Sequence, residues 1–115
     1  MNENYTRTYI VESENNNRID ISVKYDIGGY SYSYYREIER GYYFSITPYF
    51  TNGLCKTYHA FSGGRCLMVP CKRKNKKDFE KAISMIEEYT DMYLQEILDE
   101  NNINMPYDTY TESRD

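Results

Sequence analysis

Residues 19–27 alternate without a break between apolar and polar side chains. Because successive side chains of a β-strand point to opposite faces, this period of two predicts a strand with one buried face. The preceding segment, 6–13, is rich in β-branched and aromatic residues and is followed by three asparagines, which tolerate turn geometry. We therefore expect the chain to begin with a β-hairpin.

Seven of the fifteen tyrosines lie within residues 28–51. Gly28 and Gly29 can supply the positive φ angles of a two-residue hairpin turn. Such a hairpin would place one set of tyrosines in the core, on the same face as Val23, Tyr25 and Ile27: Tyr30, Tyr32 and Tyr34. The opposite face would hold the candidates for a contact surface, which are Tyr35, Tyr43 and Tyr49. A tyrosine can pack a sheet face, bind a protein partner or stack on nucleic-acid bases, and the residues alone leave all three uses open.

More strands are expected between residues 41 and 71. Alternation continues through Tyr42, Phe44, Ile46 and Phe50, with Pro48 predicting a sheet edge or an interruption because it lacks a backbone donor. The charged segment 35–40 is expected to be a connection. After the turn pair Asn52–Gly53, strands are predicted over 54–61 and 65–71, with a hairpin turn at Gly63–Gly64.

A long helix is predicted over residues 76–100, with Asn75 as its N-cap and Asp78 in a capping-box-like position. Apolar residues recur there at steps of three and four: Phe79, Ala82, Ile83, Ile86, Thr90, Tyr93, Leu94 and Ile97. The remaining residues, 101–115, are polar and are expected to form a loosely held tail. The sequence thus predicts one α+β domain over 1–100, an antiparallel β-meander of about five to six strands packed against one long C-terminal helix.

The net charge of −4 conceals an uneven distribution along the chain. Up to residue 71 the charges balance, and five cations then follow without an acid: Lys72, Arg73, Lys74, Lys76 and Lys77. Cations before a helix N-terminus favour phosphate, although a solvated linker explains them equally well. The helix beyond is acidic, and Glu87, Glu88 and Asp91 fit either ordinary solvation or a decoy surface for a protein that grips nucleic acid.

Residues suited to catalysis or to metal binding are sparse. His59 is the only histidine, and Cys55 lies four residues before it in one predicted strand, about 13 Å away, which is too far for a shared metal or a nucleophilic pair. The glycine pairs lie between strands, unlike a phosphate-binding loop. We therefore expect neither a cofactor nor enzymatic activity, with a hydrolase built on the carboxylates as the weakest alternative.

The compartment is also predicted from composition. No apolar run reaches the roughly 20 residues of a membrane span, and the first residues lack a signal-peptide layout. Three cysteines, an odd number, fit reduced thiols. These features predict a cytoplasmic protein that does not associate with membranes.

Two blocks carry a resemblance to known proteins. The segments RGYYFSITP (Arg40–Pro48) and KTYHAFSGGRCLMV (Lys56–Val69), with the basic-to-acidic helix after them, resemble small proteins carried by conjugative elements and plasmids of Gram-positive bacteria, over roughly Ile19–Ile97. In size and character the chain is similar to type II-A anti-CRISPR proteins. The resemblance implies a non-enzymatic inhibitor that binds an RNA-guided DNA nuclease and blocks guide-RNA loading or target-DNA engagement, with the guide RNA as a possible additional partner. Since such proteins share no active site, it implies no catalytic residue.

An alternative from another class is a nucleic-acid-binding accessory protein of the mobile element. In that case exposed tyrosines would stack on bases beside the basic residues 72–77. A salt-dependent gel shift on single-stranded DNA or RNA discriminates this alternative. The most informative structural observation is which tyrosines of the segment 30–49 are exposed in the folded chain, because a hairpin buried on both faces could not bind a partner.

Overall fold

The computed structural model describes residues 4–51, 56–104 and 109–114, and for Asp91 and Met92 the backbone alone. One antiparallel sheet runs in the order β6-β5-β2-β1-β8, with β7 also paired to β5. Its strands are β1 (Tyr5–Glu12), β2 (Asn17–Asp26), β5 (Gly41–Tyr49), β6 (Tyr58–His59), β7 (Met68–Pro70) and β8 (Thr111–Arg114). A separate two-stranded sheet joins β3 (Gly29–Ser31) to β4 (Arg36–Ile38). The predicted α+β architecture is confirmed.

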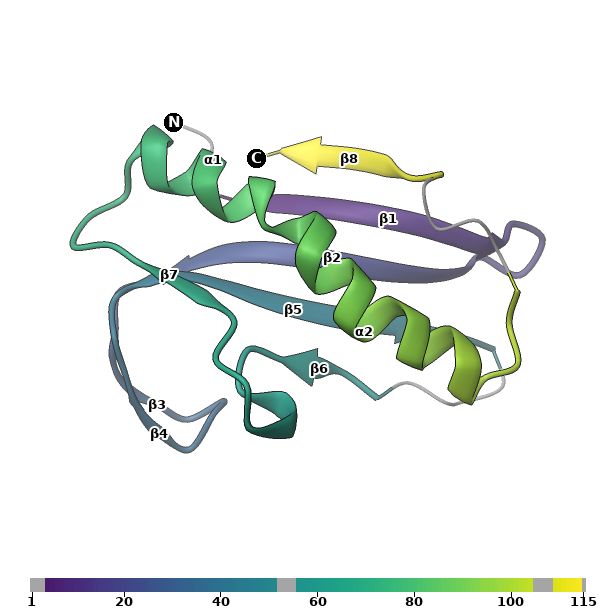
Figure 1. Ribbon diagram of the computed structural model, residues 1–115, viewed down its shortest axis with the longest axis horizontal. Helices are drawn as coiled ribbons and strands as arrows, with labels where there is room; N and C mark the ends of the chain where they lie inside the picture. The colour runs from purple at the N-terminus through teal and green to yellow at the C-terminus, as the bar shows by residue number, and fades with distance from the viewer. Residues whose placement is uncertain (1–3, 52–55, 105–108, 115) are drawn as a thin grey trace.

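The long helix lies across one face of the sheet (Figure 1). It consists of α1 (Lys76–Ser84) and α2 (Ile86–Glu100), which meet at Met85. Every member of the predicted apolar stripe is buried. Beneath it lie the inward residues of the three central strands: Tyr5, Tyr9, Ile19, Ile21, Val23, Tyr42, Phe44 and Ile46. Two periodicities in the sequence, 2.0 for strands and 3.6 for the helix, therefore meet in one core.

The predicted hairpin of β1 with β2 is present, whereas the predicted pairing of β2 with the segment 30–34 is wrong. The second neighbour of β2 is β5, in a register that runs from Arg18 opposite Tyr49 to Asp26 opposite Gly41. This pairing places the alternating apolar residues of β5 next to those of β2 over nine residues, which the short segment 30–34 cannot match. Gly28 and Gly29, with φ of +85° and +91°, turn the chain out of the sheet instead. Ile27, expected in the core, is 70% exposed.

Strands β6 and β7 do not form the expected hairpin with each other. Both pair with β5, β6 at Ser45–Ile46 and β7 at Gly41–Tyr43, so they follow one another along the same edge. One part of the expected pairing is present, since the Leu67 N–H donates to the Ala60 carbonyl at 2.8 Å. Pro48 fits its predicted place, because β5 pairs there with β2 and β6 reaches only Ile46. The turn pair Asn52–Gly53 lies outside the described residues.

The prediction of a loose tail is wrong for residues 111–114, which form β8 and pair with Tyr5–Thr8 of β1. Arg7 of β1 is buried although it is charged, and it holds β8 in place. Its guanidinium lies 2.7 Å from Glu87 of α2 and 3.5 Å from Glu112 of β8, and the Tyr5 hydroxyl donates to Glu112 at 2.6 Å. A buried cation that needs carboxylate partners explains why a short polar strand is ordered here.

Candidate nucleic-acid or protein interface

The excursion between β2 and β5, residues 28–40, forms a two-stranded ribbon that we call the tyrosine ribbon. Tyr32–Tyr35 form its turn, and Ser31 and Arg36 pair on either side of that turn. The two ends of the ribbon, Gly28 and Arg40, lie close together. A Cβ added to Gly28 would lie only 2.9 Å from the Arg40 backbone nitrogen, so only glycine fits there. The ribbon lies at one end of the sheet (Figure 1). The segment 35–40, expected to be a plain connection, contains strand β4.

One side of the ribbon packs against the sheet through Tyr34. Its ring centroid lies 5.9 Å from Tyr43, in a stacked arrangement, and 5.1 Å from both Phe61 and His59. Arg36 adds a cation–π contact, with its guanidinium 4.3 Å from the Phe61 ring. Burial raises the pKa of Tyr34, and it raises the pKa of Tyr43 to about 12. Both hydroxyls therefore stay neutral at physiological pH, as a packed aromatic cluster requires.

Tyr43 is consequently not part of a contact surface, contrary to the prediction. It does point away from the helix, as its position in the alternation indicates, but the returning ribbon covers it and leaves it 5% exposed. The sheet face that Tyr43 was expected to offer to a partner is thus covered by Tyr34 of the ribbon.

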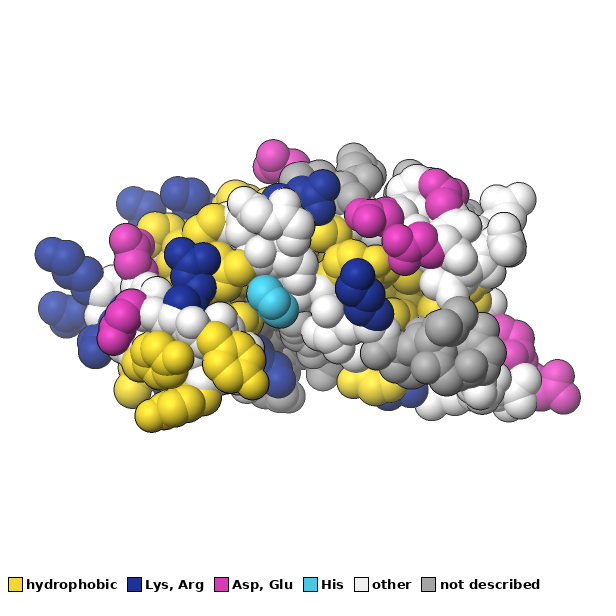
Figure 2. Space-filling view, turned by 90° about the horizontal axis from the view of Figure 1, so that it is seen from below, with side chains coloured by type: hydrophobic (Ala, Val, Ile, Leu, Met, Phe, Trp, Pro, Cys, Tyr) yellow, Lys and Arg dark blue, Asp and Glu magenta, His cyan; other side chains and the backbone are white. Residues whose placement is uncertain are grey.

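The other side of the ribbon carries exposed aromatic rings. Tyr30, Tyr32 and Tyr35 are 51%, 82% and 81% exposed. Tyr30 and Tyr32 touch each other edge to face, with ring centroids 5.0 Å apart. The prediction of a core position is wrong for Tyr30 and Tyr32, whereas Tyr35 is exposed as predicted. Figure 2 shows apolar side chains protruding from this end of the molecule with Lys and Arg side chains beside them.

The five predicted cations are all exposed, in and just after the loop from β7 to α1, and we refer to residues 72–77 as the basic run. Within the run, Asn75 caps α1 as predicted, accepting a hydrogen bond from the Asp78 N–H at 2.7 Å. Lys74 also lies over the Tyr25 ring, with its Nζ 5.5 Å from the centroid. The run is therefore a solvated group of cations next to the start of α1.

Arg40 connects the basic run to the tyrosine ribbon. Its Nε donates to the Ile27 carbonyl at 2.9 Å, at the base of the ribbon, and its Nη1 donates to the Lys72 carbonyl at 3.1 Å. The Cys71 N–H in turn donates to the Arg40 carbonyl at 3.0 Å. One exposed arginine thus fixes the two elements next to each other. No sequence pattern indicates this role, because both acceptors are backbone carbonyls distant in the chain.

The acidic residues predicted as an interface are only partly available. Glu87 forms the ion pair with buried Arg7, although its own side chain is 71% exposed. Glu88 is exposed, and the side chain of Asp91 lies outside the described residues. Glu80, also on the acidic side of the helix, pairs with Arg114 of β8 at 2.8 Å. Glu87 and Glu80 therefore hold β1 and β8 against the helix.

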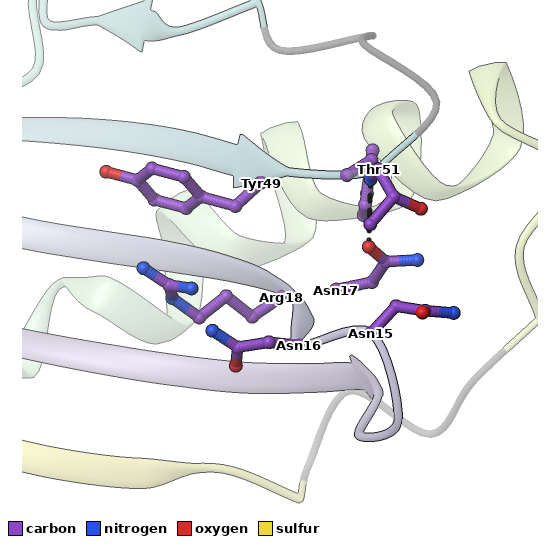
Figure 3. A pocket seen from close by; sticks show the side chains of 7 residues that line it. Asn15, Asn16, Asn17, Arg18, Tyr49 and Thr51 are labelled. Atoms are coloured by element: carbon purple, nitrogen blue, oxygen red, sulfur yellow. Dashed lines mark hydrogen bonds between the residues drawn. The ribbon is translucent and has the colours of Figure 1, made fainter.

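Tyr49 belongs to a different part of the surface. It lies at the opposite end of the β2–β5 pair from the ribbon, with the Arg18 guanidinium 4.2 Å from its ring. A shallow pocket there is lined mainly by the asparagine turn and the end of β5 (Figure 3). Asn17 already accepts a hydrogen bond from the Thr51 N–H, and Asn15 donates to Glu12, so these polar groups are engaged within the fold. The pocket offers few free groups for a ligand.

The histidine and the cysteines, the residues considered for a metal site, lie apart or have structural roles in the described part of the chain. Within 4–51, 56–104 and 109–114, no group of three or more His, Cys, Asp or Glu side chains is arranged to hold a metal. His59 accepts a hydrogen bond from the Phe61 N–H at its Nδ1, which gives the ring a structural role in the turn. Cys66 is exposed, Cys71 is half-buried with its pKa raised by burial, and Cys55 lies outside the described residues. No described helix is both long and apolar enough to cross a membrane.

Comparisons with protein-family models, with curated proteins and with solved structures found no match to this chain.

Proposed function

We propose that this protein binds single-stranded nucleic acid, without catalysis, through the tyrosine ribbon and the basic run, as a cytoplasmic accessory protein of a conjugative element or plasmid. One observation carries the proposal: Arg40 joins the base of the ribbon that bears the exposed aromatic rings to the basic run, at one end of the molecule. Proteins that bind single strands combine these two elements, aromatic faces for bases and cations for the backbone.

The energetics suit a flexible, unpaired strand. Stacking of a base on an aromatic side chain contributes about 1–3 kcal/mol and tolerates any sequence, because every base has a π-face. The cations add a salt-dependent term through release of counterions from the phosphates. The net charge of −4 does not oppose this binding locally, because acids outnumber bases chiefly after residue 77.

Fluorescence anisotropy with a labelled strand of about 15 thymidines tests the proposal. We expect salt-dependent binding that a duplex of equal length does not reproduce. Lys72→Glu should weaken binding and reduce the slope of log affinity against log salt by about 0.7 for each phosphate that the protein no longer neutralises. Lys56→Glu, an exposed cation outside the run and the ribbon, is the matched control and should leave the slope unchanged. Absence of any salt-dependent binding to DNA or RNA strands would refute the proposal.

The nuclease inhibitor implied by the resemblance is the second candidate, and the composition of the ribbon favours it. Residues 28–35 consist only of glycine, serine and tyrosine, the residues that dominate the binding loops of antibodies. Under this alternative the ribbon binds the nuclease protein. A pull-down with purified nuclease, with and without guide RNA, combined with a DNA-cleavage assay decides it: a complex that inhibits cleavage while the free protein ignores single strands selects the inhibitor.

A further inference from the structure

The backbone of Tyr35 has an unusual conformation for its residue type. Its φ is +57°, in the left-handed region, and the other described non-glycine residues with positive φ are Asn16 and Asn102. Asparagine tolerates this region, whereas a bulky aromatic residue does so only against steric repulsion. Tyr35 closes the four-residue turn of the ribbon, a place where hairpins commonly use glycine.

The neighbours of Tyr35 explain how this conformation persists. Tyr34 before it is anchored on Tyr43 and Phe61, and its N–H donates to Ser31 Oγ at 3.2 Å. Arg36 after it is paired with Ser31 and lies over Phe61. With both neighbours fixed inward, the turn directs the Tyr35 side chain outward and leaves it 81% exposed. A glycine would make the same turn without repulsion, so the ring does not serve the turn.

We propose that Tyr35 is the anchor on which a base of the bound single strand stacks. This inference rests on the proposed function and identifies the residue that contributes most to it. Backbone strain is concentrated at functional sites, where the surrounding structure enforces it. Because the neighbouring residues fix the backbone of the turn before binding, stacking of a base on the ring has to order only the Tyr35 side chain.

A tryptophan reporter tests this contact directly, since the protein contains no tryptophan. In Tyr35→Trp, excitation at a wavelength that tyrosine does not absorb reports only on position 35. We expect an oligothymidine strand to quench this emission with the same midpoint as the anisotropy titration. Tyr49→Trp places the reporter at the opposite end of the β2–β5 pair, and its emission should not change.

Two further variants separate binding from folding. Tyr35→Gly should leave the melting temperature unchanged or raise it, because it relieves the strain, yet weaken binding about tenfold. Tyr35→Phe keeps the ring and should bind as the wild type does. Wild-type affinity in Tyr35→Gly, or unchanged emission from the reporter on binding, overturns the inference while the proposed function stands. Failure of the wild type to bind any strand overturns both the inference and the proposed function. Enhanced, blue-shifted emission of the reporter on addition of nuclease protein places the ring in a protein pocket and also overturns the inference.

Discussion

The helix-covered face of the sheet and the tyrosine ribbon use the same side chain in opposite ways. Tyr5, Tyr9 and Tyr42 are fully buried under the helix, whereas Tyr32 and Tyr35 are the most exposed of the large hydrophobic residues that the structure describes. The helix face has a long strand register and a continuous apolar stripe behind it, and the ribbon has three-residue strands and one anchoring tyrosine. The difference shows that tyrosine content alone does not indicate where the core lies. Tyrosines are buried in the long strands that pair over many residues under the helix, and exposed in the short strands and the turn of the ribbon.

The largest expected effect tests the helix face. Phe44→Ala should lower the free energy of unfolding by about 3–5 kcal/mol, because the ring is buried and packs edge to face on Tyr89 with centroids 4.5 Å apart. Chemical denaturation measures the loss. A cost below about 1 kcal/mol would mean that the helix does not seal this face as tightly as its packing indicates.

A second effect probes the place where the two regions meet, through the ionisation of Tyr43. Its pKa is about 12 in the folded protein, raised by burial from about 10, so the folded state keeps a proton that the unfolded chain loses. Stability should therefore fall as the pH rises from about 10 through 12, and Tyr43 contributes up to about 1.4 kcal/mol per pH unit to this decline, alongside Tyr5 and Tyr58, whose pKa values burial also raises to about 12. Tyr43→Phe should flatten part of this decline in pH-dependent denaturation, and an unchanged curve would show that Tyr43 is accessible to water.

The third effect concerns the start of the helix, next to the basic run. Asn75→Ala removes the acceptor for the Asp78 N–H and should cost about 1 kcal/mol. Asn75→Ser retains an acceptor without adding a charge beside the Asp78 carboxylate and should recover most of the loss. If both variants are equally unstable, the donor bonds of the amide to the Arg73 carbonyl at 2.9 Å and to the Asp78 carboxylate at 2.8 Å matter more than the cap.

The smallest expected effect is on the outward side of the ribbon. Tyr32→Ser should change the free energy of unfolding by no more than about 0.5 kcal/mol, because the ring is exposed, while nucleic-acid affinity falls. Thermal denaturation and anisotropy on the same sample compare the two. A large loss of stability would erase the contrast between the ribbon and the helix face.

The helix, its cap, its stripe and the first hairpin are predictable because each depends on nearby residues and a regular period. The strand partner of β2 is not, since alternation indicates the face of a side chain and not the strand beside it; for this reason the sequence places Tyr30 and Tyr32 in the core and Tyr43 on the surface. Strand β8 escapes prediction because its stability comes from Arg7, more than a hundred residues away in the sequence. The role of Arg40 cannot be predicted either, because Arg40 donates hydrogen bonds to backbone carbonyls, which no side-chain pattern indicates.

Strand β8 also protects the protein from unwanted association. It covers the outer edge of β1 with four exposed residues that include Glu112 and Arg114, and short, charged edge strands discourage other chains from pairing. A chain ended at residue 100 would retain the helix and most of the core, but it would leave the N–H and C=O groups of Tyr5–Thr8 open. We expect such a chain to aggregate in a concentration-dependent way while it is still folded.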